Sequence, residues 1–241
     1  MKLLKLLSAS YYRVVLMVIC TLAALVVSIV HYRRHRRLRI FMYYIAFSLL
    51  QDLIAIIGIL YTPGDSRPTG LPVVLEFVSL YGFTFFEFIV YNLFILHYIN
   101  SPIWRRILRI NAWIFFALIL LGVSGTFKFL NHTYPVFEFL LESISLVPPC
   151  LIYFYQLFQT DDPQPLKDQP SFWVITGLLF LKACSIPLLL TVQLMLGYES
   201  QVFTLNYILY SLSFVLLIRA FLCPPSNAQP LTRGNSTPVS G

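Results

Sequence analysis

The sequence predicts an all-α membrane protein, a polytopic bundle of seven transmembrane helices with its N-terminus outside and its C-terminus inside. Of 241 residues, 58% are hydrophobic and only 11% are charged, whereas soluble domains carry about 25% charged residues. Apolar runs of membrane-spanning length, roughly 20 residues at 1.5 Å each, recur seven times. The runs are continuous and do not alternate with a period of two, which favours helices over a β-barrel.

These runs define one predicted transmembrane domain, residues 1–223. The seven predicted spans are 12–30, 40–61, 71–98, 107–127, 135–158, 171–196 and 202–223. The remaining segment, 224–241, is rich in Ser, Pro, Thr and Asn. That composition predicts a disordered cytoplasmic tail.

The first four spans end at polar or turn-forming segments. The first stops at the basic block 31–39, the second at the Pro- and Gly-containing stretch 62–70, and the third at Asn100 to Pro102. The fourth ends at Phe127. The first run resembles a signal peptide because lysines precede it, but it is too long for the apolar core of one. We therefore expect it to be retained as a helix.

The last three spans contain or precede helix-breaking residues. Pro148–Pro149 lies inside the fifth span and Pro187 inside the sixth. A proline removes a helical hydrogen bond, so these positions predict kinks and freed carbonyl groups. Ser171 follows the polar loop 159–170 and suits the N-cap of the sixth span. The seventh ends at Pro224.

Arginines set the predicted orientation, because the loops on the cytoplasmic side carry an excess of basic residues. With seven spans, the first and third loops lie on the same side. Their arginines are Arg33, Arg34, Arg36, Arg37, Arg39, Arg105, Arg106 and Arg109. The net charge of +7 is thus a topology signal. We expect these arginines to meet anionic lipid headgroups, and we expect no nucleic-acid partner.

Ionisable residues inside the spans are costly and tend to face the interior of a bundle. Lys182 and Glu87 are each predicted to lie within about 5 Å of the membrane midplane. We expect them to form a buried ion pair, with Asp52 close to the same level, because pairing costs less than leaving isolated charges. In the alternative, Asp52 or Glu87 is protonated.

A second polar group is predicted in the outer half. Glu138 and Glu142 are four residues apart and share one helix face; Glu76 and Glu87, about three turns apart, also share one. The candidate ligand-binding residues are Glu76, Glu87, Glu138, Glu142, Tyr153, Asn206 and Tyr210. Two readings remain open for them. They join helices by hydrogen bonds, or they line an outward-facing cavity for a small polar or cationic ligand or for protons.

Motifs for catalysis and cofactor binding are missing from the sequence. There is no P-loop, no Gly-rich dinucleotide turn and no nucleophile elbow. His97 stands alone, without the carboxylates of a membrane zinc hydrolase. A retinal chromophore requires a lysine in the last span, whereas Lys182 lies in the sixth. We therefore expect no catalytic residue, metal or cofactor.

Three segments carry a resemblance to a known family. They are Leu75-Glu-Phe77 with Phe85-Phe-Glu-Phe88, Leu141-Glu-Ser143 with Tyr153-Phe-Tyr-Gln156, and Pro170-Ser-Phe-Trp-Val-Ile-Thr-Gly177 with the residues that follow. The chain resembles the small uncharacterised seven-helix integral membrane proteins of Bacteroidota-type bacteria, from span two to span seven. The resemblance implies the architecture and a multi-pass location in the bacterial inner membrane. Lys182 departs from that family's pattern, which shifts weight to Glu87 and Glu142.

The leading functional hypothesis is a receptor-like or signalling-accessory bundle with an outward-facing polar cavity. Short loops, the odd number of spans and the lack of a catalytic domain favour it. Its expected partners are the lipid bilayer, a small polar ligand, and a cytoplasmic or membrane signalling protein that contacts the arginine loops or the loop 159–170. The alternative is a small-solute or proton-coupled transporter. An intramembrane enzyme is the least favoured class, because no nucleophile or metal set is present.

Overall fold

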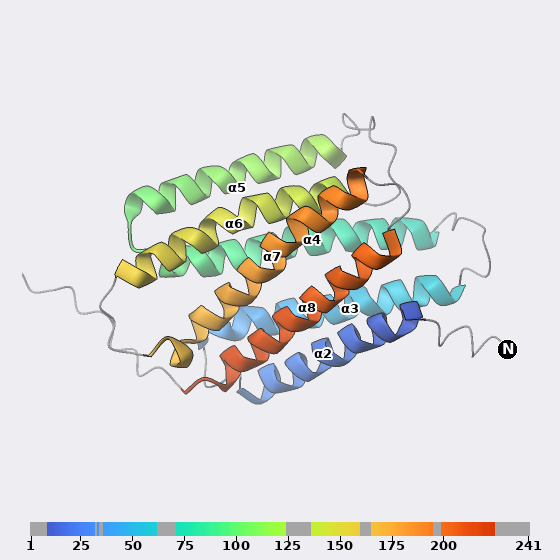
Figure 1. Cartoon of the computed structure of the whole chain (residues 1–241), viewed down its shortest axis with the longest axis horizontal. Coiled ribbons are helices and arrows are strands. Elements are labelled where there is room, and N and C mark those ends of the chain that lie inside the picture. The colour runs from blue at the N-terminus through green and yellow to red at the C-terminus, as the bar shows by residue number, and fades with distance from the viewer. Residues whose placement is uncertain are drawn as a thin grey trace, which may run out of the picture.

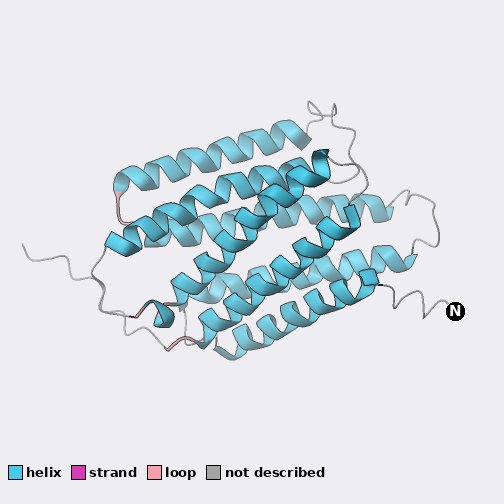
Figure 2. Ribbon diagram, in the orientation of Figure 1, coloured by secondary structure: helices cyan, strands magenta, loops and turns pink. Residues whose placement is uncertain are grey.

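The described part of the chain is entirely helical. The structure, a computed structural model, describes residues 9–31, 33, 36–61, 71–123, 136–159, 165–194 and 199–224, and no strand occurs among them (Figure 2). The long helices are α2 (Ala9–His31), α3 (Arg39–Tyr61), α4 (Leu71–Tyr98), α5 (Pro102–Val123), α6 (Val136–Gln159), α7 (Pro170–Leu194) and α8 (Glu199–Leu222). Two short 3-10 helices, η1 (Arg36–Leu38) and η2 (Leu166–Asp168), precede α3 and α7.

The long helices run side by side in alternating directions. In Figure 1, α2 and α5 form opposite edges of the bundle, and α7 and α8 cross in front of α3 and α4. Helix α8 packs against both α7 and α2, while α6 packs against α4, α5 and α7. The first and last described helices are therefore neighbours, although they are far apart in the sequence.

Six of the predicted spans differ from the observed helices by at most three residues at either end. Helix α5 begins at Pro102, five residues before the predicted start of the fourth span at residue 107. Arginine is a good helix former and proline suits the first turn. The arginines therefore join the helix, although they do not belong in hydrocarbon. The tail prediction, apart from Pro224, lies outside the described residues, as does Arg34.

Long apolar helices with exposed apolar side chains indicate a membrane-embedded protein. Among the described residues, three helical stretches are long and apolar enough to cross a bilayer, namely Phe137–Gln159, Pro170–Thr191 and Thr204–Leu222. The bundle also exposes large apolar side chains, among them Trp113 at 75% and Phe158 at 71%. Apolar exposure on this scale is typical of a surface that faces lipid.

Arginines from separate segments gather at one end of the bundle. The Arg37 guanidinium of η1 lies 5.7 Å from the ring centroid of Tyr98, at the end of α4. At the end of α8, the Arg219 guanidinium lies 5.6 Å from the centroid of Trp173, in the first turn of α7. The connection between α4 and α5, with Arg105 beside it, lies at the same end (Figure 1). We call this end, with Arg37, Arg105 and Arg219, the arginine end.

A proline inside α6 creates the contact that holds α5 to it. Pro149 has no N–H, so the carbonyl of Ser145, four residues earlier, receives no helical hydrogen bond. The side-chain amide of Asn111 on α5 donates to that oxygen across 2.8 Å. The carbonyl that Pro149 frees inside the continuous helix α6 therefore forms an interhelical joint.

Helices α7 and α8 approach closely at a glycine. A Cβ atom at Gly177 would lie 3.3 Å from Cβ of Leu216 and 3.6 Å from the carbonyl oxygen of Ser213. Small residues permit such close contact between membrane helices, where packing and not the hydrophobic effect drives association. The approach brings the polar side chains of α8 towards those of α7.

Candidate functional site

One basic and two acidic side chains, each from a different helix, meet in the bundle interior. Lys182 on α7 is 2% exposed, and both Glu87 on α4 and Glu142 on α6 are fully buried. The Lys182 ammonium nitrogen lies 3.2 Å from Oε2 of Glu87 and 2.9 Å from Oε2 of Glu142. The lysine thus bridges two carboxyl groups that belong to different helices.

Two tyrosines extend this group to two further helices. The hydroxyl of Tyr44 on α3 donates to Oε1 of Glu87 across 3.2 Å. The hydroxyl of Tyr210 on α8 donates to Oε2 of Glu87 across 3.5 Å. We call Tyr44, Glu87, Glu142, Lys182 and Tyr210 the charge cluster. Five helices therefore converge on one set of polar contacts.

Aromatic packing fixes the position of the Tyr44 hydroxyl. The Tyr44 ring stacks on Phe83 at 5.8 Å and on Phe214 at 6.3 Å between centroids. It also meets the Tyr91 ring edge-on at 5.4 Å. Such pairs stabilise by about 0.5–1.5 kcal/mol each beyond their buried area. The hydroxyl is thus held against Glu87 by the surrounding core.

The charges of the cluster do not cancel when all three ionisable groups are charged. One ammonium group faces two carboxylates, which leaves one negative charge in excess. Charges removed from water are costly, and attraction to a partner offsets this cost only where each charge is well paired. The lysine serves both carboxylates at once, so neither has a cation of its own.

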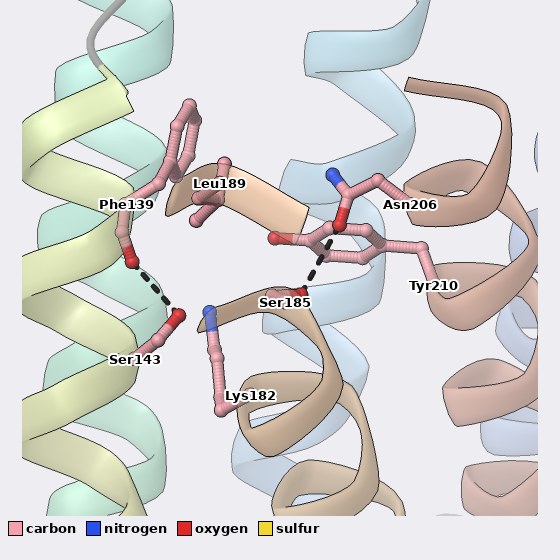
Figure 3. Close-up of a pocket in the computed structure, with 7 residues that line it drawn as sticks. All are labelled: Phe139, Ser143, Lys182, Ser185, Leu189, Asn206 and Tyr210. Carbon is pink, nitrogen blue, oxygen red and sulfur yellow. Dashed lines mark hydrogen bonds between the residues drawn. The ribbon is translucent and has the colours of Figure 1, made fainter. Parts of the chain in front are cut away.

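A small polar cavity adjoins the cluster on the side of Lys182 (Figure 3). Its lining residues are Phe139, Ser143, Lys182, Ser185, Leu189, Asn206 and Tyr210, and its volume is about 10 Å³. Ser185 donates to Oδ1 of Asn206 across 3.1 Å and so joins α7 to α8. A cavity of this size has room for roughly one water molecule, with several polar partners around it.

The predicted ligand-binding residues separate into three places: the charge cluster with its adjoining cavity, the contact of Glu138 with Tyr81, and the arginine end. Asn206 and Tyr210 line the cavity, while Glu87 and Glu142 lie in the charge cluster behind it. Glu138, one turn before Glu142, accepts a hydrogen bond from the Tyr81 hydroxyl across 2.9 Å.

The third place is the arginine end, where Tyr153 donates to the Ser171 hydroxyl across 3.0 Å. Tyr153 is eleven residues from Glu142 along α6, about 16 Å. It therefore belongs to no shared pocket with Glu142. The side chain of Glu76 lies outside the described residues.

Asp52 does not join the ion pair as expected. Its Oδ2 atom accepts a hydrogen bond from Thr21 of α2 across 3.5 Å, which joins α2 to α3. Depth along a helix does not determine which way the helix turns its side chains. Glu142, which was assigned to the outer group, takes the position beside Lys182 instead.

Several partners in these contacts could not be recognised from the sequence. Tyr44 lies in an apolar run that is typical of a lipid-facing or core segment. Asn111 lies two residues after the last of three arginines, where a polar residue is unremarkable. Thr21 and Ser185 belong to residue types that are common in membrane helices. Only a three-dimensional contact distinguishes these residues from their neighbours.

A second, larger hollow lies at the arginine end. It has a volume of about 480 Å³ and is lined by Asn100, Ser101, Trp104, Tyr155, Gln156 and Gln159. The backbone N–H of Asn100 donates to Oε1 of Gln156 across 3.2 Å, which ties the α4–α5 connection to the end of α6. This hollow is built from polar side chains and two aromatic rings, as is common where a membrane protein meets the headgroup region.

No protein-family model, no curated protein and no solved structure matches this chain. The resemblance to the seven-helix proteins of Bacteroidota-type bacteria therefore stays a prediction.

Proposed function

We propose that this chain is a receptor-like membrane bundle of seven spans, in which the charge cluster is the sensing element and the arginine end is the output surface. The observation that carries this proposal is the convergence of five helices on Glu87, Glu142 and Lys182. A change of charge or occupancy there alters the contacts of all five helices together. Such a central, shared contact is what a two-state switch requires.

The helices of the cluster continue directly to the arginine end. Lys182 and Trp173 are nine residues apart on α7, and Tyr210 and Arg219 are nine apart on α8, about 13 Å in each case. The contact between Trp173 and Arg219 joins these two helices at that end. A relative shift of α7 and α8 at the cluster is therefore expected to reach the loop 165–169.

The same proposal includes the orientation, with the N-terminus outside and the C-terminus inside the bacterial inner membrane. It is supported by the gathering of arginines from separate segments at one end, as the positive-inside rule requires. Alkaline phosphatase fusions test it, because the enzyme is active only outside the cytoplasm. We expect activity for junctions after residues 66, 131 and 197, and none after 34, 101, 163 and 224. Activity at only one of the junctions 34 and 101 would place the first and third loops on different sides and would contradict the proposed span count.

The small cavity favours sensing over solute transport. In the observed conformation it has a volume of about 10 Å³, which leaves no room for an organic solute beside Lys182. A receptor whose signal acts on the cluster itself does not require such room. The proposed ligand class is accordingly small and polar.

Hydrogen exchange tests the coupling between the cluster and the arginine end. The purified protein is compared with Glu142→Gln in lipid nanodiscs, and exchange is followed at residues 165–169 by mass spectrometry. We expect at least a threefold change in the exchange rate there, because the variant removes one charge from the cluster. Glu138→Gln is the matched control, since Glu138 lies on the same helix with Tyr81 as its partner. Equal exchange rates at 165–169 in all three proteins would contradict the proposal.

A proton-coupled transporter is the second candidate, and the prolines inside α6 and α7 favour it. Pro149 on α6 and Pro187 on α7 lie two turns or less from Glu142 and Lys182 respectively. Each proline frees a backbone carbonyl near a buried charge, and freed carbonyls beside buried charges are a feature of transporters. A proteoliposome assay with an internal pH dye separates the two functions. Proton flux above that of empty liposomes, lost in Glu142→Gln and kept in Glu138→Gln, would establish transport and refute the receptor proposal.

A further inference from the structure

The two carboxyl groups of the charge cluster lie close to each other as well as to Lys182. Oε2 of Glu87 and Oε2 of Glu142 both contact the Lys182 ammonium nitrogen, at 3.2 Å and 2.9 Å. Ionised carboxylates only accept hydrogen bonds, so a bond between them requires a proton. Oε1 of Glu142 is buried and receives no hydrogen bond from the residues that the structure describes. The geometry therefore contains a position for one more hydrogen.

We infer that Glu142 and Glu87 together bind one proton beside Lys182, and that this proton is the ligand of the charge cluster. The inference rests on the proposed function, because it names the signal to which the receptor responds. With one proton bound, the two carboxyl groups and the ammonium group have no net charge. Without it, the cluster carries one negative charge in a fully buried position.

Size and charge together select this ligand. A cavity of about 10 Å³ admits a water molecule and excludes an organic ligand. The excess negative charge excludes an anion. Metal cations are disfavoured because the Lys182 ammonium nitrogen already occupies the space between the two carboxyl groups, 3.2 Å and 2.9 Å from them. A proton needs no space of its own.

The other groups that face the cluster stay neutral over the range in which carboxyl groups titrate. They are Tyr44 on α3, Tyr91 on α4, Cys150 on α6 and Tyr210 on α8. Free tyrosine and cysteine lose their protons only near pH 10 and pH 8.5, and lysine near 10.4. Glu87 and Glu142 are therefore the groups that bind and release the proton.

The binding step transfers a proton from a hydronium ion to a carboxylate oxygen of Glu142. An O–H bond of the hydronium ion breaks and leaves water, while a new O–H bond forms on Glu142. No atom changes its oxidation state. The carboxyl group then donates to Glu87. The cavity is lined by Lys182, which contacts Glu142, and its Ser143, Ser185 and Asn206 side chains supply polar contacts for the water (Figure 3).

Infrared difference spectroscopy tests the inference directly. Wild-type protein in lipid nanodiscs is titrated with acid and base in H₂O and in D₂O, and the C=O band of protonated carboxyl groups is followed. We expect a buried carboxylic-acid band that shifts on deuteration. Its area should fall by about one carboxyl group per chain in Glu142→Gln, because a neutral Glu87–Lys182 pair needs no extra proton. Glu87→Gln should give the same loss, which keeps the test informative if one variant does not fold.

Glu138→Gln is the control and should keep the band that the cluster variants lose. An identical band in wild type and both cluster variants would overturn the inference, and so would its loss in Glu138→Gln alone. The result is separable from the exchange experiment at residues 165–169. A lost band with unchanged exchange supports the proton site and refutes the receptor function. Changed exchange with an unchanged band refutes the proton site and leaves the receptor function standing.

Discussion

Replacing Lys182 by Met removes the only cation of the charge cluster among the described residues and keeps the length of the side chain. Both carboxyl groups then lose a partner, at 3.2 Å and 2.9 Å, while they remain fully buried. Breaking a buried ion pair in this way costs about 3–5 kcal/mol, because an uncompensated charge stays behind. For a chain of this size, that loss corresponds to an unfolding midpoint lowered by roughly 6–20 °C.

The measurement is thermal unfolding of the purified protein in one lipid or detergent at pH 7 and again at pH 5. The deficit of Lys182→Met should shrink at pH 5, since protonation neutralises the two carboxylates that the variant leaves unpaired. A triple variant that also carries Glu87→Gln and Glu142→Gln should recover most of the stability, because no ionised group then remains in the charge cluster. A single variant within about 1 kcal/mol of wild type at pH 7 would refute the reasoning, as would a triple variant less stable than the single one.

Three further substitutions test contacts outside the cluster. Asn111→Leu leaves the Ser145 carbonyl without its donor and should lower the unfolding free energy by about 1–2 kcal/mol, measured by thermal unfolding; an unchanged midpoint would contradict the proposed joint. Gly177→Leu forces a side chain against Leu216 and should cost about 1–3 kcal/mol, with Gly177→Ala closer to wild type. Trp173→Phe removes an N–H donor from a loop carbonyl 2.8 Å away, so exchange at residues 165–169 should quicken; the same rate in both proteins would show that this bond does not hold the loop.

The positions of the helices were largely predictable, and the exception has a clear cause. Hydropathy detects the apolar part of a helix, so it located the seven long helices but not the first five residues of α5, where arginines continue the helix. Only the acceptor of the hydrogen bond between Asn111 and Ser145 was predictable. Pro149 shows which carbonyl lacks a donor, but the sequence does not show which helix supplies one.

For the charge cluster, depth was predictable and rotation was not. Counting residues from the span ends placed Glu87 and Lys182 at one level, and the structure brings them into contact. The same count placed Asp52 near that level, yet its partner is Thr21. Residues at one depth can face any of several neighbours, because each helix can rotate about its axis without changing depth.

The sequence by itself determined the solvent and the elements of this protein: hydrocarbon surrounds it, and each long apolar run folds as a helix because its backbone groups must be satisfied within the segment. It also determined which loops carry the arginines. Only the tertiary structure decided that Lys182 lies between Glu87 and Glu142, and that tyrosines of α3 and α8 complete the cluster. The physical reason is that helix rotation and neighbour choice depend on close packing between helices, which no single segment encodes.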